Sequence, residues 1–314
     1  MTARTTALSR IPYPIESQSP RQSKVQRLLQ SQATRRRLLG TLALALLLSA
    51  AIPAWRHLYP VTVANGWSYL VHLDGIERIS ALVEDGQGGL FVSQEIQDAK
   101  GRILQVGPDG QPKHVVEGLS KPDGMVRYHD GVAFSQEQGK HPVLWMNEQG
   151  TRQLFNGDSV EGLATDGHYL YAIEDLHGTG RLLRYDFESD NVTTLRTGLD
   201  QAEAITYCPD GRLFYTEKVL GHVRQLMPDG SDPVVLKGLR EPGFLLCNHD
   251  GLWITEDSTH MARVLLWEGM SNLNTVLSHL RSPQSIIETA PGRYLVAEQG
   301  RNRVLELDRI PARP

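Results

Sequence analysis

The sequence predicts an all-β fold: a six-bladed β-propeller whose last blade is closed by an N-terminal strand, preceded by one membrane-anchor or export-signal helix. A strand pattern recurs six times after residue 66, at a spacing of about 42 residues. Each copy reads as four short strands separated by turn residues, which is typical of a propeller blade. The sixth copy ends after three strands, and a matching fourth strand occurs before the first copy.

The N-terminal segment comes first along the chain. Residues 1–34 are rich in Ser, Gln, Arg, Thr and Pro, show no apolar periodicity, and are predicted to be a disordered cytoplasmic tail. Residues 35–55 begin with three arginines and continue with mostly apolar residues, close to the shortest length that spans a bilayer. The positive-inside rule keeps the arginines in the cytoplasm and places the chain beyond residue 56 outside it. Residues 56–65 are predicted to be a linker.

Three interpretations of residues 35–55 stay open. The first is an uncleaved anchor that leaves the propeller on the periplasmic or extracellular side. The second is a cleaved export signal, because TRRRLL resembles a twin-arginine signal and residues 49–51 are small enough for cleavage. The third is a buried core helix, which the arginine cluster and the unbroken apolar run disfavour. The first two place the globular part outside the cytoplasm, either anchored to the membrane or soluble.

Residues 66–310 are predicted to form the propeller. The first strand of each copy is apolar and is followed by a turn with Asp-Gly or a similar pair. A second apolar strand and two further strands come after this turn. Residues 68–80 read like residues 275–287, so residues 68–73 are expected to supply the missing strand of blade six. The six copies begin at Gly75, Lys121, Ser159, Gln201, Arg240 and Ser282.

Charge and motifs exclude several classes of protein. Residues 1–37 carry eight Lys or Arg and one acid, and the rest of the chain carries 24 basic and 35 acidic residues. Because nucleic acid binding needs a basic face, an acidic body argues against nucleic acid as a partner. The chain has no GxSxG elbow, P-loop, HExxH or paired CxxC, which argues against a serine hydrolase of the usual kind.

Two cysteines, Cys208 and Cys247, are too few for a disulfide framework. They occupy similar places in neighbouring repeats, so a bridge between them is one alternative. We expect buried free thiols.

The repeats resemble NHL-type repeats, and AEQGRNRVLELD (297–308) carries the pattern most clearly. The wider group that residues 66–310 resemble is the six-bladed superfamily of gluconolactonase and regucalcin, paraoxonase and strictosidine synthase. The resemblance implies a catalytic divalent cation, usually calcium, bound at the axis by the starts of the innermost strands. KPDG (121–124) matches one family motif, so the role of ligand carries over to Asp123 and, in the first blade, to Glu77. The family's ligand role cannot be assigned to further residues from the resemblance, because no Asn occurs at the six strand starts.

Acidic residues recur at the predicted starts of the innermost strands. Four carboxylates around one channel repel one another, so they need a bound cation, raised pKa values or exposure to solvent. Oxygen ligands suit calcium or magnesium better than zinc. We predict that a divalent cation, calcium, is held by Glu77, Asp123, Glu161 and Glu203, with Pro242 and Gln284 at the remaining two positions.

A second set of polar residues closes the second strand of every copy. A side chain repeated in all six blades is what the fold itself requires, so we expect these groups to accept hydrogen bonds from loop amides. They are Gln94, Gln136, Glu174, Glu217, Glu256 and Glu298.

Histidines lie in four of the loops that follow the second strands, and His222 and His177 are the candidate general bases. One hypothesis is therefore a cation-dependent hydrolase of lactone or ester substrates, with a small molecule bound on the loop face. The alternative is a non-catalytic propeller that binds a protein, sugar or peptide there, or an assembly scaffold for a membrane or periplasmic partner. The missing Asn ligands favour the alternative. A condensation of the strictosidine-synthase type has no motif in its support.

Overall fold

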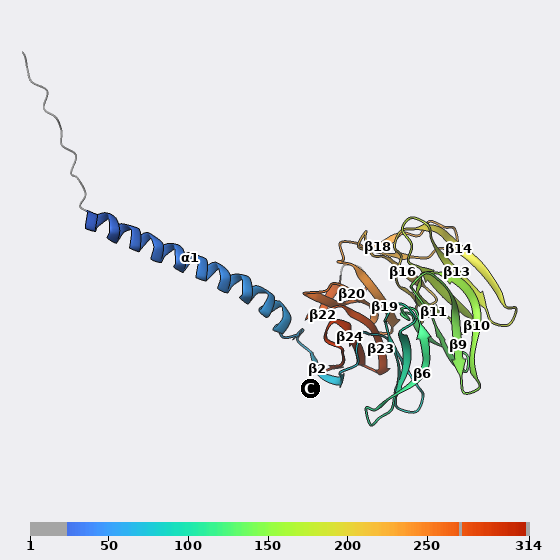
Figure 1. The fold of residues 1–314 in the computed structure, drawn as a ribbon. Helices are drawn as coiled ribbons and strands as arrows, with labels where there is room; N and C mark the ends of the chain where they lie inside the picture. The colour runs from blue at the N-terminus through green and yellow to red at the C-terminus, as the bar shows by residue number, and fades with distance from the viewer. Residues whose placement is uncertain (1–23, 270–271, 312–314) are drawn as a thin grey trace, which may run out of the picture. The chain divides into compact units, whose positions relative to one another are not determined.

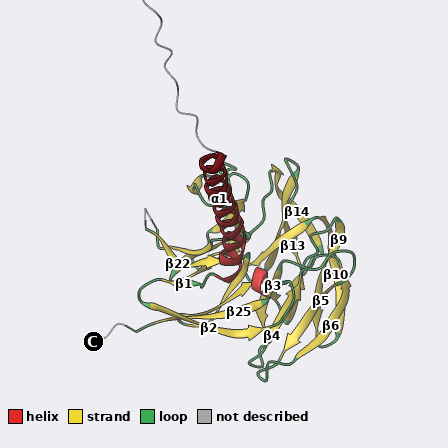
Figure 2. Cartoon of the chain, turned by 60° about the vertical axis from the view of Figure 1, so that its left-hand side comes forward, coloured by secondary structure: helices red, strands yellow, loops and turns green. Residues whose placement is uncertain are grey.

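The computed structural model describes residues 24–269 and 272–311 and divides the chain into two compact units, Met1–Tyr59 and Pro60–Pro314 (Figure 1). The described part of the first unit is one helix, α1 (Lys24–Leu58). The second unit consists of strands and loops, with one short 3-10 helix, η1 (Gln299–Arg301), in its described part (Figure 2).

Helix α1 begins earlier than the sequence predicts. Residues 24–34, predicted to be disordered, are helical, because they contain neither Gly nor Pro and are rich in helix-forming Gln, Arg, Leu and Ala. The predicted tail before them falls on residues 1–23, outside the described residues. The segment Thr34–Trp55 has a mean hydropathy of 2.0 over its most apolar window and is long enough to cross a membrane. By length, composition and place in the chain, it fits an anchor or an export signal.

The second unit is the predicted six-bladed propeller, with antiparallel blades whose strands follow one another outwards from the axis. Blade one contains β3 (Ile79–Glu84), β4 (Leu90–Gln94), β5 (Gly101–Val106) and β6 (Pro112–Leu119). Blade two contains β7 (Met125–Tyr128), β8 (Gly131–Phe134), β9 (Lys140–Asn147) and β10 (Gly150–Asp158). Blade three contains β11 (Val160–Thr165), β12 (Tyr169–Glu174), β13 (Gly180–Asp186) and β14 (Asn191–Leu199).

The remaining blades repeat this order. Blade four contains β15 (Ile205–Tyr207), β16 (Leu213–Glu217), β17 (His222–Gln225) and β18 (Val234–Leu236). Blade five contains β19 (Pro242–Asn248), β20 (Gly251–Glu256), β21 (Ala262–Trp267) and β22 (Leu273–Leu280). Blade six contains β23 (Pro283–Ala290), β24 (Arg293–Glu298), β25 (Arg303–Arg309) and, as its outermost strand, β2 (Trp67–Asp74).

Both ends of the unit contribute to closing the ring. Strand β2 pairs antiparallel with β25, which confirms the predicted closure by residues 68–73 and extends it by one residue at each end. The predicted linker also contributes, because β1 (Thr62–Val63) pairs with β22 as a fifth strand of blade five. The first and last parts of the propeller are therefore joined by backbone hydrogen bonds.

The core consists of apolar layers between adjacent blades. Six clusters of buried side chains fill the six interfaces between neighbouring blades. The largest fully buried side chain, Trp253 in blade five, packs against Tyr294 in blade six at a centroid distance of 4.4 Å. Alternate side chains of a strand point to opposite faces of the sheet, so each blade contributes to both of its interfaces.

A disulfide joins Cys208 to Cys247, and the expectation of free thiols is wrong. Cys208 directly follows β15 and Cys247 lies on β19, with their Cα atoms 4.9 Å apart, within the range that a disulfide requires. The bond links blade four to blade five directly.

Candidate functional site

One end of the propeller axis is built from three residues per blade. The first, which we call the turn position, precedes the innermost strand and has a left-handed backbone, with φ between 42° and 57° in all six blades. Its carbonyl accepts a hydrogen bond from the amide that follows the second strand, as between Arg78 and Glu95 at 2.8 Å. None of the six is glycine, so the surrounding hydrogen bonds must hold a conformation that side chains disfavour. The turn positions are Arg78, Lys121, Ser159, Gln201, Glu241 and Ser282.

Two rings of side chains follow from this repeated hydrogen bond. The inner ring, two residues after each turn position, is Ser80, Asp123, Glu161, Glu203, Gly243 and Gln284. The outer ring, which supplies the bonded amides, is Glu95, Glu137, Asp175, Lys218, Asp257 and Gln299.

The structure brings together three of the four predicted cation ligands. Asp123, Glu161 and Glu203 are 2%, 3% and 4% exposed and lie in the inner ring. Glu77 is exposed, and Ser80 takes its place, because Ile79 pairs with Gln94 as the equivalent residues pair in other blades. Comparison of the repeats places the inner-ring residue of the first blade three positions too early, at Glu77, because the segment that leads in from β2 forms an extra turn before β3.

The pairing of the first two strands likewise moves the ring position of blade five by one residue, from the predicted Pro242 to Gly243. Pro242 pairs with Glu256, so Gly243 lies in the inner ring.

Lys121 offsets part of the negative charge of the acids in blades one and two. Its ammonium forms ion pairs with Glu137 and, at 3.3 Å, with Glu95. The neighbours complete the network, since Gln299 donates to Glu95 and Ser80 donates to Asp123. Burial acts to lower the pKa of Lys121, but the surrounding carboxylates outweigh burial and raise it, so the lysine is charged.

Lys218 does the same for blades four and five. It forms an ion pair with Glu203 and another, at 3.0 Å, with Asp257. Asp257 also accepts a 2.7 Å hydrogen bond from the side-chain amide of Gln284. Burial raises the pKa of Glu203 to about 8, although the charge of Lys218 opposes this rise.

Blade three has acids and no lysine. Glu161 Oε2 and Asp175 Oδ1 are buried and accept no hydrogen bond from a protein donor, and the same holds for Glu203 Oε2 in blade four. The carboxyls of Glu161 and Glu203 lie within hydrogen-bonding reach of each other. Burial raises the pKa of both Glu161 and Asp175, and the nearby charges of Glu203 and Glu137 raise that of Glu161 further. One oxygen each of Glu137, Glu161 and Asp175 lies within 4.8 Å of the others, an arrangement that fits a hard cation such as calcium.

The candidate general bases lie against carboxylates outside both rings. His177 forms a 2.6 Å pair with Asp200, and its side chain is 83% exposed. His222 begins β17, 3.6 Å from Glu217.

Sequence reasoning missed the lysines as partners of the acids, together with the whole outer ring. A signal for the ring was present, because each member directly follows the repeated polar residue at the end of a second strand.

Four of the six polar residues that end the second strands accept a loop amide as predicted, namely Gln136, Glu174, Glu256 and Glu298. Gln94 instead donates to the carbonyl of Glu77, and Glu217 accepts a hydrogen bond from Arg224. Glu174 accepts hydrogen bonds from the amide of Asp158 at 3.0 Å and from Arg181 at 2.7 Å. Glu256 and Glu298 likewise accept bonds from the amides of the loops leading into their own blades, at 2.9 Å each. Arginines hold both carboxylates as well.

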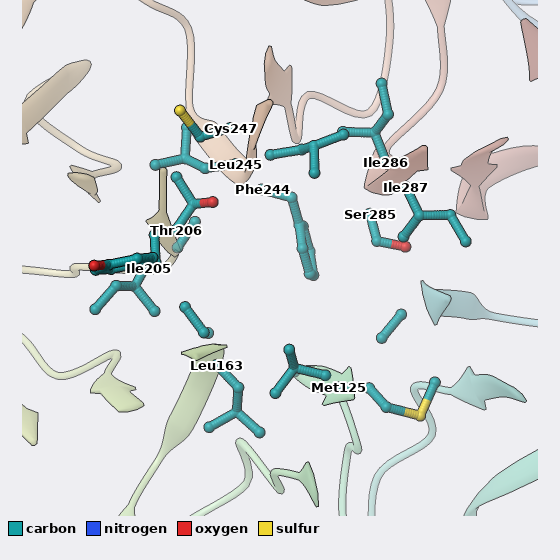
Figure 3. A pocket seen from close by; sticks show the side chains of 18 of the residues that line it. Met125, Leu163, Ile205, Thr206, Phe244, Leu245, Cys247, Ser285, Ile286 and Ile287 are labelled. Atoms are coloured by element: carbon teal, nitrogen blue, oxygen red, sulfur yellow. The ribbon is translucent and has the colours of Figure 1, made fainter. Parts of the chain in front are cut away.

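The inner strands enclose a cavity of about 210 Å³ that begins next to the inner ring. Figure 3 shows the ring of Phe244 lying across the middle of this cavity. The residues that directly follow the inner ring are Ala81, Gly124, Gly162, Ala204, Phe244 and Ser285. Five of the six are small, so they leave space that one aromatic side chain fills.

No protein-family model matches the chain, and no curated protein matches it either. Solved structures do match. An auxiliary nutrient binding protein from Bacteroides thetaiotaomicron aligns with a TM-score of 0.62 and 13% identity, over 81% of this chain and 78% of the other. A protein assigned as a gluconolactonase aligns with a TM-score of 0.61 and 12% identity, over 78% and 93%.

Virginiamycin B lyase from Staphylococcus aureus aligns with a TM-score of 0.54 and 16% identity, over 79% of this chain and 93% of the other. These likenesses confirm the six-bladed fold expected from the repeats. At such low sequence identities, structural similarity shows the fold alone and does not show the function.

Proposed function

We propose that this propeller is a non-catalytic binding module that is located outside the cytoplasm and meets its ligand on the face formed by the outer ring. The observation that carries the proposal is the closure of the inner ring, whose three acids are at most 4% exposed. A hydrolase must bring the substrate carbonyl to its cation and its base. A buried inner ring leaves the partly exposed members of the outer ring, Glu137, Asp175, Lys218 and Asp257, and the adjoining loops as the surface that a partner contacts.

That surface suits a protein or peptide partner. Lys218, partly exposed, is followed by Val219 and Leu220, which are 61% and 48% exposed. Exposed apolar side chains beside partly buried charges can anchor a partner while the charges set its orientation.

Photo-crosslinking in membranes of the native host tests this surface. A photoreactive residue at position 219 is expected to give one discrete adduct, and the same residue at Val115, on the outer strand β6, is expected to give none. Changing Leu220 to Asp should remove the adduct from position 219. Equal adducts at both positions would contradict the proposal.

The proposed location has two supports. The apolar segment of α1 follows three arginines, and the propeller contains a disulfide, which persists in oxidising compartments. Protease added to intact spheroplasts should digest the propeller if it lies outside the cytoplasmic membrane. Protection until the membrane is lysed would place it in the cytoplasm.

A cation-dependent hydrolase of lactones or esters is the second candidate, favoured by the unpartnered oxygens of Glu161 and Asp175. A bound cation would polarise the substrate carbonyl. Asp123 and Glu203 would complete the acidic site, and His222 or His177 would act as base, as the sequence predicts. Calcium-stimulated hydrolysis that is lost in both Asp123→Asn and Glu161→Gln would establish this candidate and overturn the binding proposal.

A further inference from the structure

We propose that the end of the propeller axis opposite the inner ring binds a zwitterionic ligand with an apolar body, either an apolar amino acid or a short apolar peptide. The site is a pocket of about 500 Å³ formed by blades six, one and two. The inference goes beyond the proposed binding function and does not rest on it, because the pocket and the outer ring lie at opposite ends of the inner strands.

A third ring of residues, which we call the far ring, lies near the ends of the inner strands, four positions after each inner-ring residue. Its charged members are confined to three adjacent blades, with Glu288 in blade six, Glu84 in blade one and Arg127 in blade two. The members in blades three, four and five are Thr165, Tyr207 and Cys247. Charge is therefore concentrated on one half of the far ring.

The pocket combines this charged half with an apolar wall. Glu84, Arg127 and Glu288 all line it. The wall consists of Leu82, Val83, Met125, Val126 and Ile287. All of these except Val83 also line the central cavity, and Figure 3 shows Met125 and Ile287 on the same side of that cavity. An apolar wall with a few charged groups, in a pocket of this volume, is typical of a small-molecule site.

The charged groups of the pocket do not neutralise one another. In the part of the chain that the structure describes, no ion pair includes Glu84, Arg127 or Glu288. An ion pair would require a nitrogen of Arg127 within 4.0 Å of a carboxylate oxygen. Opposite charges that line one pocket without contacting each other leave space for a ligand that carries both charges.

Neighbouring residues position two of these groups. The carboxylate of Glu288 accepts a 2.7 Å hydrogen bond from the side chain of Asn248. The guanidinium of Arg127 lies against the turn after β3, where a Cβ on Gly86 would come within 2.8 Å of it. The charge of Arg127 reaches Asp85 in that turn, but the Asp85 carboxylate already accepts two backbone amides at 2.8 Å each. Arg127 donates no hydrogen bond in the described part of the chain, so its donors remain for a ligand.

These features select a ligand by its charges. A guanidinium binds a carboxylate through two parallel hydrogen bonds, so Arg127 suits the carboxylate of an amino acid or peptide. Glu84 and Glu288 suit its ammonium group, and the apolar wall suits its side chains. A simple anion would meet two acids for one arginine, and an uncharged apolar molecule would bury these charges without a partner.

Calorimetric titration of the full chain in mild detergent tests the pocket with three probes, which are leucine, leucyl-leucine and trileucine. The probe that binds most tightly distinguishes a free amino acid from a peptide. Leucyl-leucine, with about 17 non-hydrogen atoms, is expected to bind with a dissociation constant on the order of 10⁻⁴ M. The proposal is overturned if none of the three binds with a dissociation constant below about 10 mM.

Variants test the role of each charge. Arg127→Gln is expected to weaken the binding of leucyl-leucine about tenfold. Leucyl-leucine amide lacks the carboxylate, so it should bind this variant no more weakly than the wild type. Glu84→Gln combined with Glu288→Gln should also weaken leucyl-leucine about tenfold. N-acetyl-leucyl-leucine lacks the ammonium group, and the double variant should not weaken its binding.

Glu117→Gln is the matched control, because it removes an exposed carboxylate from β6, outside the pocket, and should keep full binding. Arg127 is exposed, so its variant is expected to fold, and an unchanged melting temperature verifies this. The proposal is also overturned if Arg127→Gln weakens the amide as much as the free dipeptide, or if Glu117→Gln weakens binding as much as Arg127→Gln.

Discussion

Phe244 is the one large side chain at a position that the other five blades give to small residues. It follows Gly243 of the inner ring and lies across the central cavity (Figure 3). Gly243 has no side chain to fill its own place in the ring, and a Cβ there would approach Asp257 to 3.1 Å. Blade five therefore contributes bulk to the channel and leaves room in the ring for its neighbours' carboxylates.

Phe244→Ala is expected to lower the free energy of unfolding by about 3 kcal/mol, the low end for Phe→Ala, because Phe244 is only half-buried. Urea unfolding measures the loss. Ala204 is the equivalent residue in blade four, so Phe244→Ala combined with Ala204→Phe should recover part of it. No recovery would show that the cavity does not accept the ring from blade four.

Asp232 joins blade three to blade four. Its carboxylate accepts hydrogen bonds from Arg196 on β14 at 2.7 and 2.8 Å, from Tyr215 at 3.0 Å and from the amide of Met227 at 2.8 Å. Burial acts to raise the pKa of Asp232, but these hydrogen bonds and the charge of Arg196 outweigh burial and lower it below 3.8.

Asp232→Asn is expected to cost roughly 2–3 kcal/mol of stability at pH 7, because it weakens hydrogen bonds to a charged group. A carboxyl with a lowered pKa in the folded state stabilises the protein above its ordinary pKa, and this contribution is lost as pH falls through the lowered value. The stability difference between wild type and variant should therefore narrow below pH 3.8, the ordinary value. Urea unfolding across pH measures it, and a constant difference would contradict the assignment.

At the scale of elements, β2 is held in place by more than its hydrogen bonds. Trp67, its first residue, contacts Trp253 of blade five at 5.5 Å and Tyr294 of blade six at 6.0 Å, between ring centroids. Arg309 of β25 lies over the same indole at 4.7 Å. One side chain thus connects the closing strand to both blades.

Trp67→Ala is expected to cost about 3 kcal/mol, because it leaves a gap between the closing strand and the two blades. Leu70→Ala provides the matched control on the same strand, since Leu70 is exposed and its truncation should change stability by no more than about 0.5 kcal/mol. Thermal unfolding of both variants checks the difference. Equal losses would mean that the strand is held by its backbone pairing alone.

The sequence predicted the elements better than the site. Repeats fix which strands exist, and the likeness between residues 68–80 and 275–287 was enough to predict the closure by β2. Positions within a strand were harder to predict. Strand pairing decided that Ser80 and not Glu77 lies in the inner ring, and it breaks register between Ile79 and Leu82, where an alignment by hydrophobic pattern has no reference point.

Contacts between blades were beyond prediction for the same reason. Lys121 and Glu95, and likewise Lys218 and Asp257, come from different repeats, and a pattern read along one repeat does not reveal partners in the next. The sequence left the disulfide as one of two alternatives, because spacing along the chain does not show whether Cys208 and Cys247 approach within bonding distance.

At the scale of the whole molecule, the disulfide restrains one interface of the ring. Cys208 and Cys247 are 39 residues apart, and a cross-link over a loop of this length lowers the entropy of the unfolded chain. In the chain-entropy account the stabilisation is about 4 kcal/mol.

Adding a reductant is therefore expected to lower the melting temperature by roughly 8–15 °C for a propeller of this size. A variant with both cysteines changed to serine should melt at the lower temperature and show no further response to reductant. The expectation is contradicted if the melting temperature of the wild type stays the same in reductant although thiol labelling shows that the disulfide has been reduced.

The pairing of β2 with β25 also dictates the order in which the molecule can be completed during synthesis. Trp67 and its partner Arg309 lie at opposite ends of the propeller sequence, so this contact has nearly the highest sequence separation that the domain allows. While the intervening blades are being made, β2 has no partner and presents an open strand edge, the feature that promotes aggregation. Nascent chains should therefore depend on chaperones until the last strand emerges, and shortened chains that lack β25 should be recognised and degraded.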